Sequence, residues 1–195
     1  MACGIHRKGN GAGSFTFAPD PRFASEMRAL GYPHLSPEQV FSMAIQNVSL
    51  DYVRSLKSLG VANATADDLI TMRIHDVTIE YIRDLQSLGY GKLKPDQLVT
   101  FRIHDVEICF IQELNQLGYR SVPPDELVTM RIHDATTDFI KALKSLGYEH
   151  PSIDQLVTMK IHDVTPEYIR KLRGQGMKRL TIDQLVSLRI HGIAD

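Results

Sequence analysis

Residues 118–146 read GYRSVPPDELVTMRIHDATTDFIKALKSL, and residues 89–117 read GYGKLKPDQLVTFRIHDVEICFIQELNQL. The two stretches share their Gly-Tyr start, the letters LVT and the letters RIHD at the same positions. The correspondence continues at a step of 29 residues through Gly31, Gly60, Gly89, Gly118, Gly147 and Gly176, and through Ile45, Ile74, Ile103, Ile132, Ile161 and Ile190. Self-similarity at a fixed period of this size indicates an array of structural repeats.

Each repeat carries start signals for a first short helix, here named helix A. Candidate N-cap residues are Ser36, Thr65, Ser152 and Thr181, and three residues later come Gln39, Asp68, Gln155 and Gln184. Ser36, Ser152 and Thr181 with their glutamines are predicted to form capping boxes. Pro37, Pro95 and Pro124 stand where the first helical residue needs no free N–H. The sequence therefore predicts where helix A begins.

A second helix, here named helix B, follows in each repeat. Its candidate N-caps are Ser49, Thr78, Thr136 and Thr165, and an acidic residue in the first turn, such as Glu80 or Asp138, suits the helix dipole. The repeating glycine can adopt the left-handed conformation that ends a helix. Both ends of both helices are thus predicted from local signals.

Helices of about ten residues are marginal alone in water, so the repeats must stack to bury their apolar faces. The predicted fold class is all-α, an α-solenoid of two-helix 29-residue repeats with about twelve short helices, TPR-like in having two helices per repeat. We expect one solenoid over residues 14–195, with a cap helix at 21–30, repeats starting near 31, 60, 89, 118 and 147, and a half-repeat at 176–195. Residues 1–13 are predicted to be a disordered Gly-rich tail, and SFTFAPD at 14–20 to extend over the first helix.

Composition narrows the function classes. The formal net charge is −1, which gives no basic field for nucleic acid. The start of the chain lacks the apolar core of a secretory signal, and no stretch reaches the ~18 apolar residues of a membrane span. The chain is expected to be soluble, either in the cytoplasm or as a module of a larger protein. Its two cysteines, Cys3 and Cys109, are expected to be free thiols.

The RIHD motif invites a chemical interpretation, because His and Asp build metal sites and acid/base pairs. At about 100° per residue, Arg73 and Ile74 fall within the apolar arc of helix A, and Thr71 and His75 fall on its polar side. The isoleucine is therefore expected in the core. Neighbouring repeats should lie about 10 Å apart, too far for their histidines to share one zinc ion. No catalytic, cofactor or metal site is predicted.

Two columns of the motif are assigned structural roles. The cations should bury their stems and bind helix-end carbonyls or a neighbouring carboxylate. The aspartates should form the turn after helix A, or pair with the cation of the same or an adjacent repeat. The residues are Arg73, Arg102, Arg131, Lys160 and Arg189, with Asp76, Asp105, Asp134 and Asp163.

The candidate partner-binding face is the polar side of helix A. It comprises Thr71, His75, Thr100, His104, Thr129, His133, Thr158, His162 and His191. On helix B the exposed positions vary more between repeats, with Arg83, Gln112, Lys141 and Arg170 in one column and Asp84, Glu113, Ala142 and Lys171 in another. Helix B is expected to be a solvated outer face, with the alternative that its variable positions encode specificity.

The units LVTMRIHDATTDFIKALKSLGY and LVTMKIHDVTPEYIRKLRGQG, with the lead-in FTFAPDPRFASEMRALGY, resemble the helical repeats that follow the peptidase part of some bacterial transmembrane metallopeptidases of the β-lactam-sensor and antirepressor type. The resemblance covers residues 14–195 and rests on the RIH and GY elements. The HExxH motif and the membrane helices of those proteins are absent from this sequence. The resemblance therefore implies a bacterial binding or sensing appendage without catalysis.

Three functional hypotheses follow. The first is a non-enzymatic scaffold that binds a protein or peptide along the helix A face, with a sensing or regulatory appendage as one form of it and with no cofactor, nucleic acid or membrane involved. The second is a self-assembling rod or homo-oligomer, because Val186, Ile190 and Ile193 in the final half-repeat should be partly exposed. The third is a histidine-based metal or pH sensor.

Overall fold

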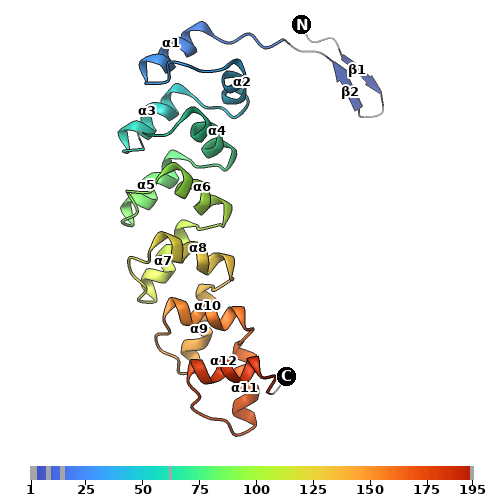
Figure 1. Ribbon diagram of the computed structural model, residues 1–195, viewed down its shortest axis with the longest axis vertical. Coiled ribbons are helices and arrows are strands. Elements are labelled where there is room, and N and C mark those ends of the chain that lie inside the picture. The colour runs from blue at the N-terminus through green and yellow to red at the C-terminus, as the bar shows by residue number, and fades with distance from the viewer. Residues whose placement is uncertain (1–3, 8–9, 14–15, 62, 194–195) are drawn as a thin grey trace. The chain divides into compact units, whose positions relative to one another are not determined.

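The computed structural model describes residues 4–7, 10–13, 16–61 and 63–193, and within them the chain forms twelve α-helices of nine residues each (Figure 1). The predicted all-helical repeat fold is confirmed. The chain divides into two compact units, residues 1–79 and 80–195, which are described separately. A single continuous array over residues 14–195 stays a prediction.

The first unit contains α1 (Pro21–Ala29), α2 (Pro37–Ile45), α3 (Leu50–Ser58) and α4 (Ala66–Ile74). Helix α5 (Ile79–Ser87) begins at the last residue of this unit. The second unit continues with α6 (Pro95–Ile103), α7 (Ile108–Gln116), α8 (Pro124–Ile132), α9 (Thr137–Ser145), α10 (Ile153–Ile161), α11 (Pro166–Gly174) and α12 (Ile182–Ile190). Even-numbered helices are the predicted A helices, and odd-numbered helices are the predicted B helices.

The predicted helix starts are confirmed. Capping boxes form at Ser36, Thr65, Ser152 and Thr181, where each hydroxyl accepts a hydrogen bond from the backbone N–H three residues on. On helix B, Ser49, Thr136 and Thr165 cap α3, α9 and α11 in the same way. These bonds satisfy N–H groups that the helix itself leaves free, so each of these seven helices has a fixed first turn.

Two kinds of residue end the helices. Each B helix ends at the repeating glycine, for example Gly118 at φ +97°, and the next residue donates its N–H back into the last turn. Each A helix except the last ends in the same way with an asparagine or aspartate at φ 51° to 53°, such as Asp134, and the N–H of Ala135 reaches the carbonyl of Met130 at 2.8 Å. Asp and Asn tolerate this left-handed conformation better than most side chains, so the motif's Asp is a turn former, as predicted.

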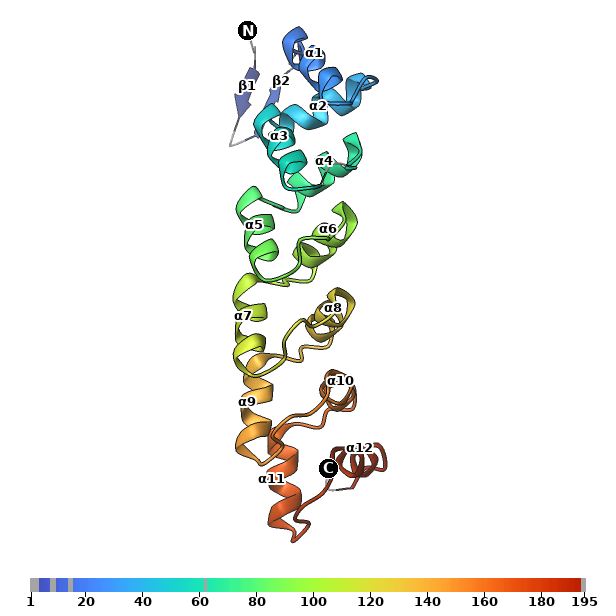
Figure 2. The same ribbon diagram turned by 90° about the vertical axis from the view of Figure 1, so that its left-hand side faces the viewer.

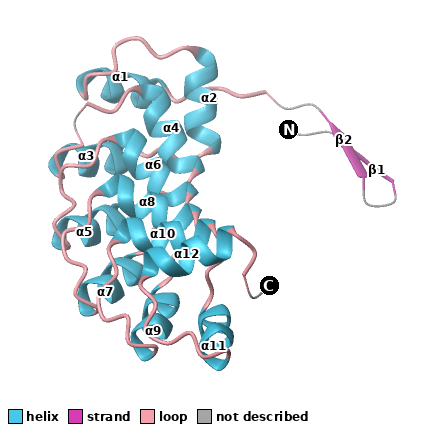
Figure 3. Cartoon of the chain, turned by 60° about the horizontal axis from the view of Figure 1, so that its bottom comes forward, coloured by secondary structure: helices cyan, strands magenta, loops and turns pink. Residues whose placement is uncertain are grey.

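In both units, A helices pack against A helices and B helices pack against B helices. In the first, α1 contacts α3 and α2 contacts α4; in the second, α7, α9 and α11 form one row and α6, α8, α10 and α12 another (Figures 2 and 3). The core lies between the rows. Helix A contributes Leu127 and Met130, and helix B contributes Phe110, Ile111 and Leu114, all buried, with equivalent residues buried in the other repeats.

Tyrosines join successive repeats within each unit. The helix B phenols of Tyr52, Tyr81 and Tyr168 donate to carbonyls 25 residues later, on Val77, Val106 and Ile193, at 2.6 to 2.8 Å. Burial raises the pKa of Tyr52 and Tyr81 far above the ordinary value, so the donating proton is retained. The GY tyrosines Tyr32, Tyr90, Tyr119 and Tyr148 make similar bonds 32 residues ahead. Each such bond fixes one repeat against the next.

At the helix B position of Tyr52, Tyr81 and Tyr168, two repeats have phenylalanine instead of tyrosine. These residues are Phe110 and Phe139. We predict that Phe110→Tyr raises the free energy of unfolding by about 1 kcal/mol, because the new hydroxyl can donate to the carbonyl of Ala135, the counterpart of Val106. The reverse change, Tyr81→Phe, should lower it by a similar amount. Urea unfolding followed by circular dichroism measures both. A destabilising Phe110→Tyr would show that the site has no room for the hydroxyl.

The N-terminal segment differs from expectation. Strands β1 (Gly4–Arg7) and β2 (Asn10–Gly13) pair antiparallel, with Gly4 opposite Gly13, so the prediction of a disordered tail is corrected for these residues. The physical reason is that the backbone N–H and C=O groups of the two strands hydrogen-bond to one another. A prediction from the Gly-rich composition does not take this pairing into account. Residues 1–3, 8–9 and 14–15 of the predicted tail and cap lie outside the described residues. Phe17 packs edge-on against Phe41 of α2, with ring centroids 5.2 Å apart, and lines one pocket together with Phe23 of α1.

Candidate partner-binding face

Every A helix presents one exposed stripe, which we name the A-face stripe. It consists of an acidic residue, a hydroxyl residue four positions on and an isoleucine seven positions on, which share one side of a helix. The acidic members are Glu38, Asp67, Asp96, Asp125, Asp154 and Asp183, the hydroxyl members are Ser42, Thr71, Thr100, Thr129, Thr158 and Ser187, and the isoleucines are Ile45, Ile74, Ile103, Ile132, Ile161 and Ile190. The acids are exposed and most of the hydroxyl residues are half-buried.

The isoleucines overturn the sequence interpretation. They were expected in the core, but their exposed fractions run from 52% at Ile103 to 64% at Ile45. The helical wheel of helix A has the correct period. The arc of helix A that is buried is narrower than the sequence interpretation assumed, and it is centred on Leu127, Met130 and their equivalents. Helix B covers only that side, so an isoleucine at about 140° from the leucine lies outside the covered arc. The isoleucine of the RIHD motif is therefore an exposed apolar side chain and not a core residue.

The cations of the arginine column contact helix B rings and helix-end carbonyls or carboxylates. The guanidinium of Arg131 lies 5.2 Å from the ring centroid of Phe110, and its Nε donates to the carbonyl of His104 at 3.3 Å. In the first unit Arg73 lies over Tyr52 and donates to the carbonyl of Gln46 at 3.2 Å. The corresponding side chains of Arg102, Lys160 and Arg189 are only 22% to 27% exposed and also lie over helix B rings. These cations brace helix A against helix B.

The aspartates after helix A also behave as predicted. Besides forming the turn, Asp134 pairs with Lys160 at 2.9 Å and Asp163 pairs with Arg189 at 2.6 Å, each from one repeat to the next. These pairs tie the last turn of one A helix to the following A helix. The carboxylates of Asp134 and Asp163 therefore help to hold neighbouring A helices together.

The histidines do not form the most open part of the face. His75, His104, His133 and His162 are the C-cap residues of their helices and are half-buried, and His191 alone is exposed. Its Nδ1 lies 2.7 Å from the carbonyl oxygen of Ser187. Among the described residues no three His, Cys, Asp or Glu side chains lie close enough together to hold a metal ion. The histidines thus flank the A-face stripe.

Three of the four threonines of the stripe have already used their hydroxyl protons. Thr71, Thr100 and Thr129 each donate to the carbonyl four residues earlier, at 2.8 Å. What they offer a partner is a lone-pair acceptor and a methyl group. With the carboxylates beside them, the polar atoms of the stripe are mainly hydrogen-bond acceptors.

Between α10 and α12 the stripe is hollowed. The groove there has a volume of about 350 Å³ and is lined by Asp154, Thr158, Ile182, Ser187, Ile190 and His191. Acidic, hydroxyl and isoleucine members of the stripe therefore meet in one depression. A side chain of a partner could enter there.

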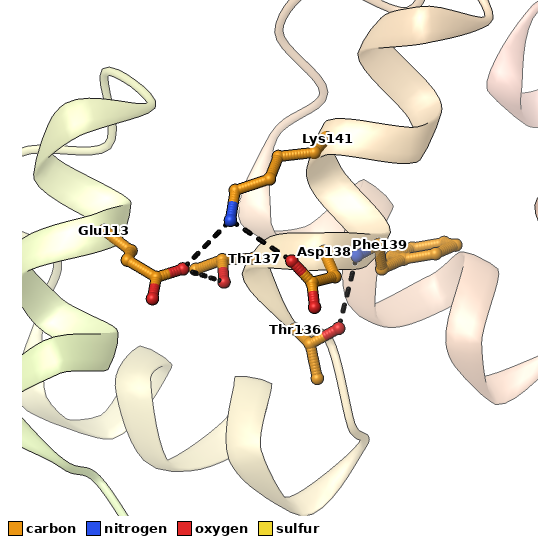
Figure 4. Close-up of polar contacts among 6 residues, drawn as sticks. All are labelled: Glu113, Thr136, Thr137, Asp138, Phe139 and Lys141. Carbon is orange, nitrogen blue, oxygen red and sulfur yellow. Dashed lines mark hydrogen bonds and ion pairs between the residues drawn. The ribbon is translucent and has the colours of Figure 1, made fainter.

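On the exposed surface of helix B, acidic side chains are paired with basic ones. Lys141 bridges Glu113 and Asp138, with its Nζ 3.1 Å from a carboxylate oxygen of each, and Thr137 also donates to Glu113 (Figure 4). Hydrogen bonds from Thr137 and Lys141 lower the pKa of Glu113. Charges on this side are matched within and between repeats. Cys109 is an exposed free thiol on the same side.

No protein-family model matches this chain, and neither a curated protein nor a solved structure matches it. Among the described residues, no helix is both long and apolar enough to cross a membrane. The site is therefore argued from its own geometry.

Proposed function

We propose that this protein is a non-enzymatic helical-repeat scaffold that binds a protein or peptide along the A-face stripe. The observation that carries the proposal is the isoleucine column, in which every repeat leaves more than half of an isoleucine in water. Burial of a whole isoleucine contributes roughly 1.5 to 3 kcal/mol, so the fold gains little from these side chains. Isoleucine is also not a strong helix former. A binding partner would recover the unused apolar surface.

The contrast between the two helices supports the same proposal. Across the A helices the exposed isoleucine is unchanged in all six repeats, whereas the outer column of helix B changes from Arg83 to Gln112 to Lys141. A requirement of packing alone would not fix an exposed position. The resemblance to repeats of bacterial sensor-type metallopeptidases is compatible with such a binding appendage and stays a prediction.

A peptide-library selection tests the proposal. We expect peptides selected on the intact protein to bind at least tenfold more weakly when the apolar column of the second unit is removed by Ile103→Ser, Ile132→Ser and Ile161→Ser. Serine has a helix propensity close to that of isoleucine, so the helices should persist. Circular dichroism checks this.

The matched control changes helix B without altering charge, by Gln112→Ser, Gln116→Ser and Ala142→Ser. The selected peptides should bind this variant as they bind the unmodified protein. A selection that enriches nothing, or peptides insensitive to the isoleucine variant, would refute binding along this face.

Self-association is a second candidate, and one observation favours it. Leu188 in α12 is half-buried, whereas its counterparts Met43, Met72, Phe101, Met130 and Met159 are fully buried. Val186, Ile190 and Ile193 are partly exposed, as expected, but Ile190 is no more exposed than Ile45 and so is not special to this end. A second copy packing on Leu188 would appear as growth in mass in light scattering over a concentration series. A constant monomer mass would remove this candidate.

A further inference from the structure

We infer that the partner segment is a cationic amphipathic helix that lies across the A helices of the second unit. The inference rests on the proposed function and adds the charge and shape of the ligand. It is carried by the placement of acids, acceptors and isoleucines on one stripe of α6, α8, α10 and α12.

The stripe is acidic because its cations are directed elsewhere. Asp96, Asp125, Asp154 and Asp183 are exposed and form no ion pair with a described residue. The basic residue of each A helix lies over a helix B ring instead, with a largely covered side chain. The exposed cations near this row lie in the loops that precede the A helices and not on the stripe itself, at Lys92, Lys94, Arg120, Lys178 and Arg179. Helix B differs, since Lys141 there neutralises two carboxylates.

The acids lie near helix N-termini, where the dipole stabilises negative charge, and this alone would make no site. The second observation is the isoleucine seven residues further along the same helices, exposed by 52% to 58% in this unit. Between acid and isoleucine, Thr100 and Thr129 have committed their protons to backbone carbonyls. The surface therefore offers hydrocarbon and acceptors, which are complementary to apolar side chains and to N–H donors such as Lys and Arg.

The dimensions fit a helix. Seven residues along an A helix span about 10.5 Å, so the acidic row and the isoleucine row are separated by roughly one helix diameter of 10 to 12 Å. Neighbouring A helices pack about 8 to 10 Å apart. A partner helix crossing them advances about 10.5 Å per seven residues, so it can set one apolar residue near each isoleucine. Lysines on its flank then face the aspartates.

Phosphate-bearing partners fit poorly, because the exposed carboxylates repel them. Nucleic acid and anionic lipid are thereby disfavoured. A neutral membrane could still use the isoleucines, and it enters the test as an opposing result.

Three synthetic 28-residue peptides form the test. Each has an alanine background with one leucine per seven residues, and the flanking polar positions are all lysine, all glutamine or all glutamate. Fluorescence anisotropy at low salt should show the lysine peptide binding at least tenfold more tightly than the glutamate peptide, with the glutamine peptide between them. Its affinity should fall as salt is added.

Two matched variants locate the contact. Asp125→Asn with Asp154→Asn should weaken the lysine peptide by about tenfold. Asp84→Asn with Asp138→Asn changes the net charge equally but on helix B, away from the stripe, and should leave its affinity unchanged. Ile132→Ser with Ile161→Ser should also abolish tight binding, which separates docking from nonspecific charge attraction.

Several results would overturn the inference. They are equal binding of the three peptides, no binding of the lysine peptide, equal loss in both charge variants, or preferential binding of the protein to phosphatidylcholine vesicles. If the library selection nevertheless yields isoleucine-dependent peptides of another character, the scaffold proposal stands and only the partner's chemistry is wrong. If the selection fails as well, the scaffold proposal falls.

Discussion

Leu127→Ala is expected to lower the free energy of unfolding by about 2 to 5 kcal/mol, whereas Ile132→Ala should change it by less than about 1 kcal/mol. Leu127 is fully buried between the helix rows, so its truncation leaves a cavity. Ile132 is 55% exposed five residues later on the same helix. Alanine also favours the helix, which offsets the small loss of contact at Ile132.

Urea unfolding followed by helical circular dichroism measures the difference. Leu127→Met is the control, because a volume-conserving change should cost less than about 1.5 kcal/mol. Repeat arrays need not unfold in one step, so the transitions should be compared for slope as well as midpoint. Equal losses for Leu127→Ala and Ile132→Ala would mean that the isoleucine is part of the core and that the A-face stripe is not an open apolar surface.

Arg102→Ala is expected to destabilise the protein by about 1 to 2 kcal/mol, and His104→Ala by clearly less. The guanidinium of Arg102 lies 5.0 Å from the ring centroid of Tyr81 and 3.0 Å from a carboxylate oxygen of Glu107. Its loss removes a cation–π contact, an ion pair and the packing of a mostly covered stem. His104 is a half-buried C-cap whose backbone, not its side chain, completes the helix end.

The same unfolding experiment compares the two variants, and Arg102→Lys serves as the control. Lysine keeps the charge but lacks the planar guanidinium, so it should recover part of the loss. The array itself has Lys160 at the equivalent position, over Phe139 and paired with Asp134, which shows that lysine is accommodated. Small and equal effects of both alanine variants would contradict the bracing role.

The sequence predicted the helix ends well because the interactions that set them are local. The cap at Ser152 needs only Gln155, three residues away, and the turn at Gly118 needs only a backbone that accepts positive φ. The structural roles of the arginines and aspartates were also predictable, since a long cation near a buried position has few ways to keep its charged group satisfied. The hydrogen bonds that tyrosines donate from one repeat to the next were not predicted, although the fixed spacing of Tyr52, Tyr81 and Tyr168 was visible in the sequence.

The sequence alone determined the 29-residue period, the two helices of each repeat and their limits, because these depend on contacts within a few residues. Only the tertiary structure decided which side of helix A stays open. A helical wheel gives the angles between Leu127, Ile132 and His133 but not the width of the arc that a neighbouring helix covers. That width is set by the packing of helix A against helix B and against the A helices beside it. It leaves the isoleucines, rather than the histidines, as the most exposed members of the motif's helical face.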